Sequence, residues 1–319
     1  MGPIASIDLG THTARLLVAR PTGNGSGFEP LVRERAIIRL AQGMDRDGGG
    51  VLSEEAVARA LEALEQFRRL VRELDGEILQ AVCTGVIRSA ANRDAFLRRI
   101  TRETGLQARS ITGGEEAELT RKGVIASLGH PKGAFVIFDL GGGSTEFIYR
   151  KQAVAQDVSI RSLPLGALLL TEAFLQDDPP HEEALRTLTD HLDEVLSREL
   201  PGRDVFSGAL QLIGTGGTVT TLAAMVHGIE AEAIAPERMN GLTLSRKALE
   251  GLFRRITQLP LVRRRELRGL DPRRADILPA GTLAVLRVMH YFEAVEMSVS
   301  LSDILEGLLI AYLEEEEYE

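Results

Sequence analysis

The sequence predicts a duplicated α/β fold made of two similar domains. The chain has 319 residues, which is enough for about two domains. A motif at 7–13, with Asp8 before a Gly-containing turn, returns at 138–145, with Asp139 before a run of glycines. Each copy lies between two short apolar runs and is followed by a similar mixture of strands and helices. A repeated order of elements indicates an internal duplication.

The first half of the chain opens with strands and continues with alternating helices and strands. Short apolar runs predict strands at 4–10, 14–20 and 31–39. Ser53 is a residue type suited to cap a helix, and the apolar positions after it recur with helical spacing. We also expect a buried strand at 78–84, a helix at 92–104, a short strand at 109–112 and a helix at 115–128.

The second half repeats this order from residue 134 onward. We place the two domains at 1–128 and 129–302, and we expect the last helix, about 303–319, to pack back on the first domain. The predicted strands are 134–139, 145–150, 158–163 and 211–213. The predicted helices are 166–175, 181–199, 219–227, 245–257, 260–268, 272–289 and 303–316.

Composition favours a globular protein of a reducing compartment. Hydrophobic residues make up 44% of the chain, and the net charge of −9 is concentrated in an acidic tail from Glu314 onward. Cys83 is the only cysteine, so no intrachain disulfide can form, and its apolar neighbours predict a core position. The charge-free stretch 205–229 is interrupted by glycines and no signal peptide is visible, so we expect a cytoplasmic protein without a membrane partner.

The two Asp-Gly turns are the first candidates for chemistry. Glycine lets a backbone approach a ligand closely, and exposed amides and hydroxyls suit phosphate oxygens. Asp8 and Asp139 would then hold Mg²⁺ or its waters, because carboxylates suit a hard divalent cation. The alternative is that both turns are plain hairpins capped by their Asp side chains. The predicted phosphate contacts in these turns are Gly10, Thr11, Thr13, Gly141, Gly142, Gly143, Ser144 and Thr145.

A pair of acidic residues, Glu115 and Glu116, stands at the start of a predicted helix. Acidic side chains are favoured there by the helix dipole alone, so a solvated helix start is one interpretation. The other interpretation is catalytic, because hydrolysis of a phosphoanhydride needs a group that orients the attacking water. The residues themselves do not distinguish Glu115 from Glu116.

Two arginines are placed where they could contact phosphate. Arg88 follows a buried strand directly, and ligands of open α/β sheets bind at strand ends. Arg15 follows the first turn by two residues and could reach the same ligand. A guanidinium makes two parallel bonds to phosphate oxygens, although each side chain alone is also compatible with a surface cation.

Two further segments could bind anions. A third glycine-rich turn leads into a predicted helix, and a helix N-terminus after such a turn is suited to bind an anion. This turn could hold a nucleotide, a distal phosphate or no ligand. Six arginines between 263 and 274 form either a track for a polyanionic substrate or a solvated helix face. No groove-reading motif and no metal-ligand spacing of histidines is seen, so we expect neither nucleic-acid binding nor a zinc site. The third turn consists of Gly214, Thr215, Gly216, Gly217 and Thr218.

In their order along the chain, these segments resemble the exopolyphosphatase and guanosine pentaphosphate phosphohydrolase (Ppx/GppA) family. The resemblance runs from residue 4 to about 310. It implies the two-domain fold shared by acetate and sugar kinases, actin and the heat-shock chaperone ATPases, with two ribonuclease H-like domains and an active site in the interdomain cleft. The segments that carry it are 5–15, 88–94, 112–117, 139–146, 162–167, 214–218 and 269–276.

The resemblance also implies roles for single residues. Glu116 matches the catalytic base, and Asp139 and Glu146 match acidic residues linked to Mg²⁺ and catalysis. The run 141–144 matches the phosphate loop. The matching phosphate-binding arginines are Arg15, Arg88 and Arg274.

Two segments depart from the family pattern. His12 stands where the family has Asn, so its expected contact with phosphate differs in chemistry. The family's Ser-Asp-x-Gly-Leu-Arg-Glu-Gly is replaced at 300–307 by Ser-Leu-Ser-Asp-Ile-Leu-Glu-Gly, without the Asp and the Arg. Longer relatives continue into a helical C-terminal region, and this chain resembles the short form.

We therefore expect a Mg²⁺-dependent exopolyphosphatase that hydrolyses the terminal phosphoanhydride of inorganic polyphosphate and releases orthophosphate. The basic segment and the short form favour polyphosphate over guanosine pentaphosphate (pppGpp) as substrate. The alternatives are a pppGpp phosphohydrolase, a non-catalytic sensor that binds (p)ppGpp or polyphosphate, and a kinase built on the same fold. The resemblance is compatible with a homodimer.

Overall fold

The computed structural model of the chain describes residues 2–23, 25–44, 50–152 and 158–316. The chain divides into two compact units: unit 1 is Met1–Gly123 with Asp303–Glu319, and unit 2 is Val124–Ser302. The division falls inside helix α3 (Gly113–Leu128), before the boundary expected near Leu128. Gly129 marks the end of the helix in the sequence, but Leu119 and Gly123 of α3 pack against the start of the last helix, and this part of α3 therefore belongs to unit 1.

Unit 1 contains a five-stranded sheet in the order β3-β2-β1-β4-β5. Its first three strands form an antiparallel meander, and β4 and β5 extend the sheet in parallel on the other side of β1. The central strand β1 is buried along its whole length, as expected for a strand covered on both faces. The strands are β1 (Ile4–Leu9), β2 (Thr13–Pro21), β3 (Phe28–Ile37), β4 (Glu77–Cys83) and β5 (Ala108–Ser110).

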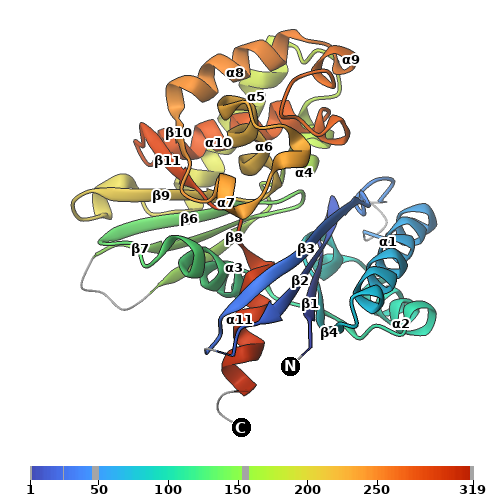
Figure 1. The fold of residues 1–319 in the computed structure, drawn as a ribbon. Coiled ribbons are helices and arrows are strands. Elements are labelled where there is room, and N and C mark those ends of the chain that lie inside the picture. The colour runs from blue at the N-terminus through green and yellow to red at the C-terminus, as the bar shows by residue number, and fades with distance from the viewer. Residues whose placement is uncertain (1, 24, 45–49, 153–157, 317–319) are drawn as a thin grey trace. The chain divides into compact units, whose positions relative to one another are not determined.

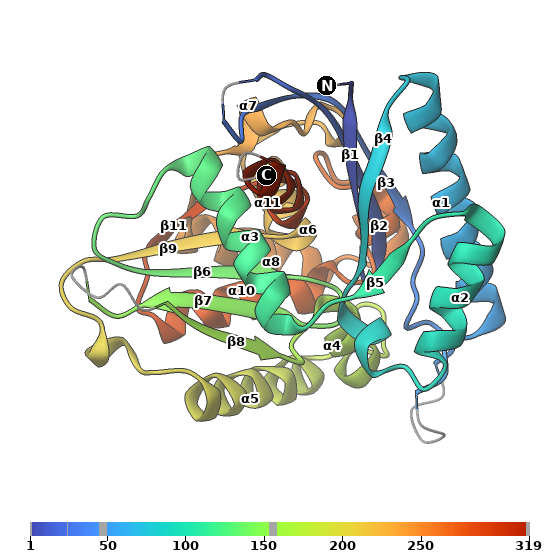
Figure 2. The ribbon, with the colours of Figure 1, turned by 90° about the horizontal axis from the view of Figure 1, so that it is seen from below.

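Helices cover both faces of the sheet in unit 1 (Figure 2). On one face lie α1 (Glu54–Glu73) and α2 (Arg93–Thr104). Ser53 caps α1 as predicted, because its Oγ accepts a hydrogen bond from the Ala56 N–H at 3.3 Å. On the other face, α11 (Ile304–Glu316) buries its leucines against β1 and β2. As expected, this helix therefore packs on unit 1.

Unit 2 repeats this arrangement in a six-stranded sheet with the order β10-β11-β9-β6-β7-β8 (Figure 1). In each unit the strand that carries the motif Asp has a hairpin partner on one side and a parallel strand on the other. The predicted duplicated α/β fold is thereby confirmed. The strands are β6 (Ala134–Leu140), β7 (Thr145–Arg150), β8 (Ser159–Leu163), β9 (Leu210–Thr215), β10 (Thr243–Ser245) and β11 (Glu296–Val299).

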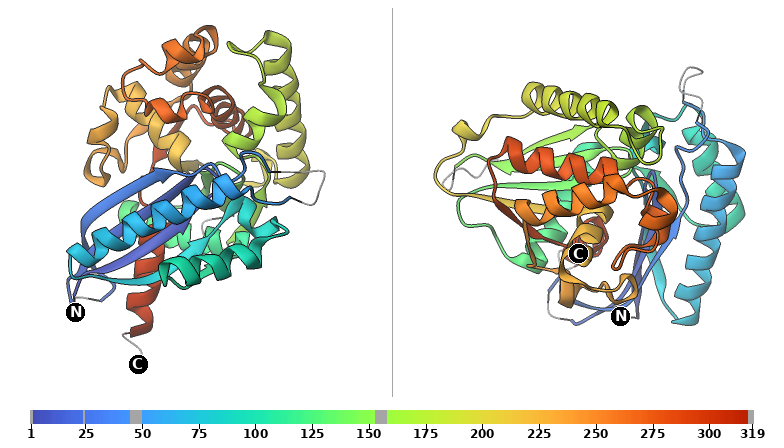
Figure 3. Two further views of the ribbon diagram at one scale, coloured as in Figure 1. Left: turned by 90° about the vertical axis from the view of Figure 1, so that its right-hand side faces the viewer. Right: turned by 90° about the horizontal axis from the view of Figure 1, so that it is seen from above.

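The helices of unit 2 form a layer around α10 (Leu278–Tyr291), which is buried along almost its whole length. Figure 3 shows this layer from above in its right-hand view. Within the described residues, no helix is both long and apolar enough to cross a bilayer. The helices that α10 contacts are α4 (Ala167–Phe174), α5 (Glu182–Glu199), α6 (Gly217–His227) and α8 (Arg246–Gln258).

Several short elements of unit 2 differ from the prediction. The strands β10 and β11 and the helix α7 (Pro236–Met239) were not expected, because so few residues cannot show a period. Helix α9 covers only Leu261–Arg264 of the predicted 260–268. Helix α10 begins at Leu278 instead of 272, because a separate 3₁₀ turn, Pro272–Arg274, precedes it.

Cys83 lies at the end of β4 with no solvent exposure, which confirms the predicted core position. Burial raises the pKa of its thiol well above the ordinary value, so the thiol stays protonated and unreactive at neutral pH. We expect Cys83→Ala to keep full activity and to lower the free energy of unfolding by about 1 kcal/mol, through lost volume. Denaturant unfolding measures this change, and rapid alkylation of the folded wild-type protein would contradict the buried position.

Candidate functional site

The two predicted turns have the same hydrogen bonding. In unit 1 the Gly10 N–H donates to the Thr13 carbonyl at 3.0 Å, and in unit 2 the Gly141 N–H donates to the Ser144 carbonyl at 3.0 Å. The strands on either side pair in the same register, with Leu9 opposite Ala14 and Leu140 opposite Thr145. The motif repeated in the sequence is therefore a repeated hairpin of equal turn length.

In unit 2 the turn is held by the N-terminus of α4. The N–H groups of Ala167 and Leu168 donate to the carbonyls of Gly141 at 2.9 Å and Gly142 at 3.0 Å. A trans peptide points its N–H away from its carbonyl, so the N–H groups of Gly142 and Gly143 point away from α4. Adjacent amides that point to one side can cradle the oxygens of a phosphate group.

In unit 1 the segment after β3 holds the turn in the same way. The Leu40 N–H donates to the Thr11 carbonyl at 2.7 Å, and the Ile38 N–H donates to the His12 carbonyl at 3.0 Å. The Thr11 hydroxyl accepts a hydrogen bond from the Val86 N–H at 3.0 Å, which ties the turn to the 3₁₀ segment after β4. Thr11 and His12 are both buried, so they brace the turn from inside the unit.

The residue opposite the motif Asp differs between the two units. Across β1 and β2, Asp8 pairs with Arg15, whereas across β6 and β7, Asp139 pairs with Glu146. Directly opposite residues on neighbouring strands place their side chains on the same face of the sheet. The first hairpin therefore puts a cation beside its Asp, and the second hairpin puts a second carboxylate there.

Both carboxylate oxygens of Asp8 accept hydrogen bonds. Arg15 donates to Oδ2 through Nε at 3.0 Å and Nη2 at 2.7 Å, and the Thr84 hydroxyl donates to Oδ1 at 3.1 Å. Burial raises the pKa of the Asp8 carboxyl, and the Arg15 guanidinium opposes that rise. A carboxylate already neutralised by a guanidinium is a poor ligand for a divalent cation, which disfavours the predicted metal role of Asp8.

A row of polar side chains crosses the second sheet beside its turn. Thr215 pairs with Asp139, Asp139 pairs with Glu146, and Glu146 pairs with Ser162. All four side chains therefore lie on one face of the sheet. Asp139 is 7% exposed and Glu146 is 1% exposed, so two carboxyl groups are buried side by side. A divalent cation would relieve their repulsion, and carboxylate oxygens are suitable ligands for Mg²⁺.

Ser162 belongs to this row and was missed by sequence reasoning. Its Oγ donates to Glu146 Oε1 at 2.7 Å and orients that carboxylate. Only the antiparallel register of β7 and β8 shows which hydroxyl faces Glu146. The neighbouring Thr145, predicted to bind phosphate, donates through its hydroxyl to the Leu165 carbonyl at 2.9 Å and so braces the segment before α4.

Glu116 and Arg88 form an ion pair in unit 1. Arg88 lies on the 3₁₀ segment Gly85–Ser89, and Glu116 lies in the first turn of α3. The Glu116 side chain is 11% exposed, whereas the Glu115 side chain is 39% exposed and pairs with Arg109 at 2.6 Å. The structure thus distinguishes the two acidic residues, because Glu116 is the less exposed one and is paired with Arg88.

The third glycine turn leads into α6, as predicted. Gly216 has a φ of 92°, a backbone conformation that favours glycine. The buried Arg274 places its guanidinium against Gly217, where any side chain at 217 would overlap with it. A buried guanidinium at the positive end of a helix is stabilised by an anion, which suits a phosphate group. Gly214 lies inside β9, where a Cβ would meet the Phe138 ring at 2.9 Å, so core packing accounts for that glycine.

The sequence matches the Ppx/GppA phosphatase family over residues 17–316. The chain belongs to this family. Exopolyphosphatase 2 of Mycobacterium tuberculosis is 32% identical, and the match covers 97% of this chain and 98% of that protein. Exopolyphosphatase 1 of the same organism is 29% identical, with 97% of this chain and 88% of that protein covered.

Solved structures of Ppx/GppA proteins have the same fold. The Aquifex aeolicus family member has a TM-score of 0.79 and 30% identity, with 100% of this chain and 99% of that chain covered. An exopolyphosphatase from Cytophaga hutchinsonii has a TM-score of 0.83 and 27% identity, with 98% of each chain covered. These similarities confirm the expected two-domain fold of the sugar kinase, chaperone ATPase and actin class.

In this Ppx/GppA protein, the arginines of the basic segment are largely paired within the chain. Such pairs cancel much of the positive charge that a polyanion would meet, and Arg264 is buried. The segment therefore gives little support to the hypothesis of a polyphosphate track. The pairs are Arg263 with Glu266, Arg264 with Asp178, Arg268 with Glu230 and Arg273 with Asp271.

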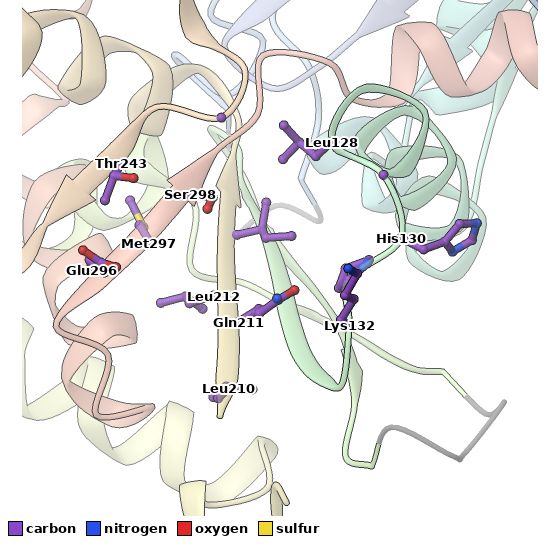
Figure 4. Close-up of a pocket in the computed structure, with 14 residues that line it drawn as sticks. Leu128, His130, Lys132, Leu210, Gln211, Leu212, Thr243, Glu296, Met297 and Ser298 are labelled. Atoms are coloured by element: carbon purple, nitrogen blue, oxygen red, sulfur yellow. The ribbon is translucent and has the colours of Figure 1, made fainter. Parts of the chain in front are cut away.

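Unit 2 also contains a cavity of about 460 Å³ (Figure 4). It is lined by the first residues of β9 and β11 and by the loop between α3 and β6, whereas the turn lies at the other end of β6. The side chains of His130, Lys132 and Glu296 at this cavity are exposed to solvent. None of the predicted site residues lines this cavity, so it does not belong to the candidate phosphate site.

We expect Gly166→Ala to damage the phosphate loop of unit 2. A Cβ at 166 would overlap with the Gly142 carbonyl and the Gly143 nitrogen, so the loop amides must move. A displacement of this kind can lower kcat/KM about 100-fold. Phosphate-release kinetics measure the loss. Gly251→Ala in α8 is the control, because a Cβ there meets only the tip of Arg254 at 4.0 Å; equal losses in both variants would contradict the expectation.

Proposed function

We propose that this Ppx/GppA protein is an exopolyphosphatase that removes the terminal phosphate of inorganic polyphosphate in a Mg²⁺-dependent reaction. The observation that carries the proposal is the buried pair of Asp139 and Glu146 beside a turn whose amides point to one side. The names of the Mycobacterium tuberculosis relatives support polyphosphate as the substrate.

In the proposed reaction, water attacks the terminal phosphorus and the bond to the bridging oxygen breaks. The buried Glu116 orients the water and accepts its proton, so orthophosphate and a polyphosphate one unit shorter are the products. Arg88, held by Glu116, neutralises charge on the phosphate oxygens. In unit 2, the N–H groups of Gly142 and Gly143 are suited to bind phosphate oxygens.

The residues of unit 2 fit a Mg²⁺ ion better than those of unit 1. Bound Mg²⁺ would act as a Lewis acid on the phosphate. Asp139 and Glu146 would hold the ion, whereas the oxygens of Asp8 are taken by Arg15 and Thr84. Within the described residues, no group of three or more acidic, His or Cys side chains is placed to bind a metal. This is consistent with Mg²⁺, which is often held by one or two carboxylates together with waters and substrate phosphates.

The proposal is tested by measuring phosphate release from long-chain polyphosphate and from pppGpp, each with Mg²⁺ and with EDTA. We expect release from polyphosphate that stops with EDTA. Release from pppGpp alone would make the protein a pppGpp phosphohydrolase. Binding of either compound without release, by a folded protein, would support the sensor alternative. The cytoplasmic location and the homodimer stay predictions.

A further inference from the structure

A cluster of buried charges lies at the start of α11 in unit 1. Asp303 directly precedes this helix and is 2% exposed. The Nη1 of Arg15 forms an ion pair with Asp303, while Nε and Nη2 of the same guanidinium bind Asp8. One guanidinium therefore joins two buried carboxylates, and its planar fork fixes the position of both.

Asp303 is itself held in place by the end of α11. Its Oδ1 accepts a hydrogen bond from the Leu305 N–H at 3.3 Å, and its own N–H donates to Glu306 Oε2 at 2.9 Å. This reciprocal arrangement is a capping box. The other oxygen of Glu306 pairs with Arg33 of β3, so the capping box is anchored to the sheet. Asp303 thus presents a rigid carboxylate to Arg15.

The same helix end also touches the helix that carries Glu116. A Cβ at Gly123 of α3 would overlap with the Asp303 carbonyl, and a Cβ at Gly307 of α11 would overlap with the Leu119 carbonyl. The two helices therefore approach each other at backbone distance. The start of α11 is in contact with both the hairpin of Asp8, through Arg15, and the helix of Glu116, through Leu119.

We propose that Asp303 is a positioning residue that acts through Arg15 to hold the Asp8 carboxylate beside the turn of unit 1. The proposal rests on the proposed function, because that turn is part of the predicted phosphate site. Without Asp303, the Arg15 guanidinium loses a carboxylate that fixes its orientation, and it then orients Asp8 less rigidly.

The test compares Asp303→Asn with Glu306→Gln. Asn keeps the size and the capping oxygen of Asp303 but removes the charge that Arg15 meets. Gln at 306 removes a charge from the same capping box but leaves the pair of Arg15 and Asp303 intact. We expect Asp303→Asn to lower kcat at least about 10-fold with a small change in KM, and Glu306→Gln to stay within about twofold of the wild type. Equal kcat values in the two variants would overturn the proposal.

A second comparison separates positioning from a general effect on the fold. In the background of Arg15→Gln, the change Asp303→Asn should have no further effect on kcat, because the residue through which it acts is gone. If the two substitutions lower kcat by factors that multiply in the double variant, the proposal is overturned.

A readout without catalysis distinguishes failure of this inference from failure of the proposed function. The signal of the Nη1 hydrogens of Arg15, which meet Asp303, is assigned in a ¹H–¹⁵N spectrum by its loss in Arg15→Gln, and it should exchange slowly with solvent in the wild type and in Glu306→Gln. It should exchange fast in Asp303→Asn. If this pattern holds while the wild type releases no phosphate, the proposed function fails but the positioning of Arg15 stands. An unchanged signal in Asp303→Asn overturns the positioning role.

Discussion

Glu116→Gln should lower the turnover of polyphosphate by about 100-fold or more, the range expected for the loss of a general base. Gln keeps the shape of the side chain and an oxygen for Arg88, but it lacks the negative charge that accepts a proton from water. Because the role proposed for Glu116 is to act on the attacking water, kcat should fall while KM changes little. Steady-state phosphate release over a range of polyphosphate concentrations measures both quantities.

The control for this prediction is the neighbouring residue. Glu115→Gln changes the same chemical group on the same helix turn, but its side chain is 39% exposed and pairs with Arg109. We expect its turnover to stay within about twofold of the wild type, as for an exposed ion pair. Thermal unfolding of both variants shows whether the fold is retained. Equal losses of turnover in the two variants would contradict the proposed role of Glu116 as the general base.

Asp139→Asn should have two opposite effects in unit 2. It removes one charge of the buried pair with Glu146, so turnover should fall about 100-fold and the Mg²⁺ concentration for half-maximal activity should rise. In the absence of Mg²⁺, the same change removes the repulsion between two buried carboxylates. The free energy of unfolding should therefore rise by about 1 kcal/mol, as is common where a functional site is strained. Phosphate release at graded Mg²⁺ and denaturant unfolding in EDTA measure the two effects.

Asp8→Asn at the equivalent position of unit 1 should behave in the opposite way. Asp8 is paired with Arg15, so removing its charge weakens a buried ion pair and should lower the free energy of unfolding by about 3 kcal/mol. The Mg²⁺ requirement should not change, because Arg15 and Thr84 already take the oxygens of Asp8. A raised Mg²⁺ requirement in Asp8→Asn would restore the metal role that the sequence suggested for this residue.

That residues of both units act in one reaction stays a prediction from the family resemblance. A double-mutant cycle tests it directly. If Glu116 and Asp139 act on the same phosphate, the variant with both substitutions should lose little more turnover than the worse single variant. Losses that simply multiply would indicate that the two residues act independently.

The sequence alone determined the class of fold and most of the candidate residues. The apolar runs and glycine turns placed nearly all the longer elements, because helical and strand periods are local properties of a chain. The repeated turn showed the duplication, and the structure confirms it in the matching hydrogen bonds of Gly10 and Gly141. Three elements of three or four residues, β10, β11 and α7, carried too little periodicity to be predicted.

Only the tertiary structure decided which of these residues become neighbours. Strand register sets Arg15 beside Asp8 but Glu146 beside Asp139, although the two turns look alike in the sequence. Burial distinguishes Glu116 from Glu115, and the return of the chain brings Asp303 to Arg15 across 288 residues. The physical reason is that a local pattern determines whether a segment forms a helix or a strand. The charges that meet depend on how distant segments pack, and that packing sets the chemistry beside each of the two turns.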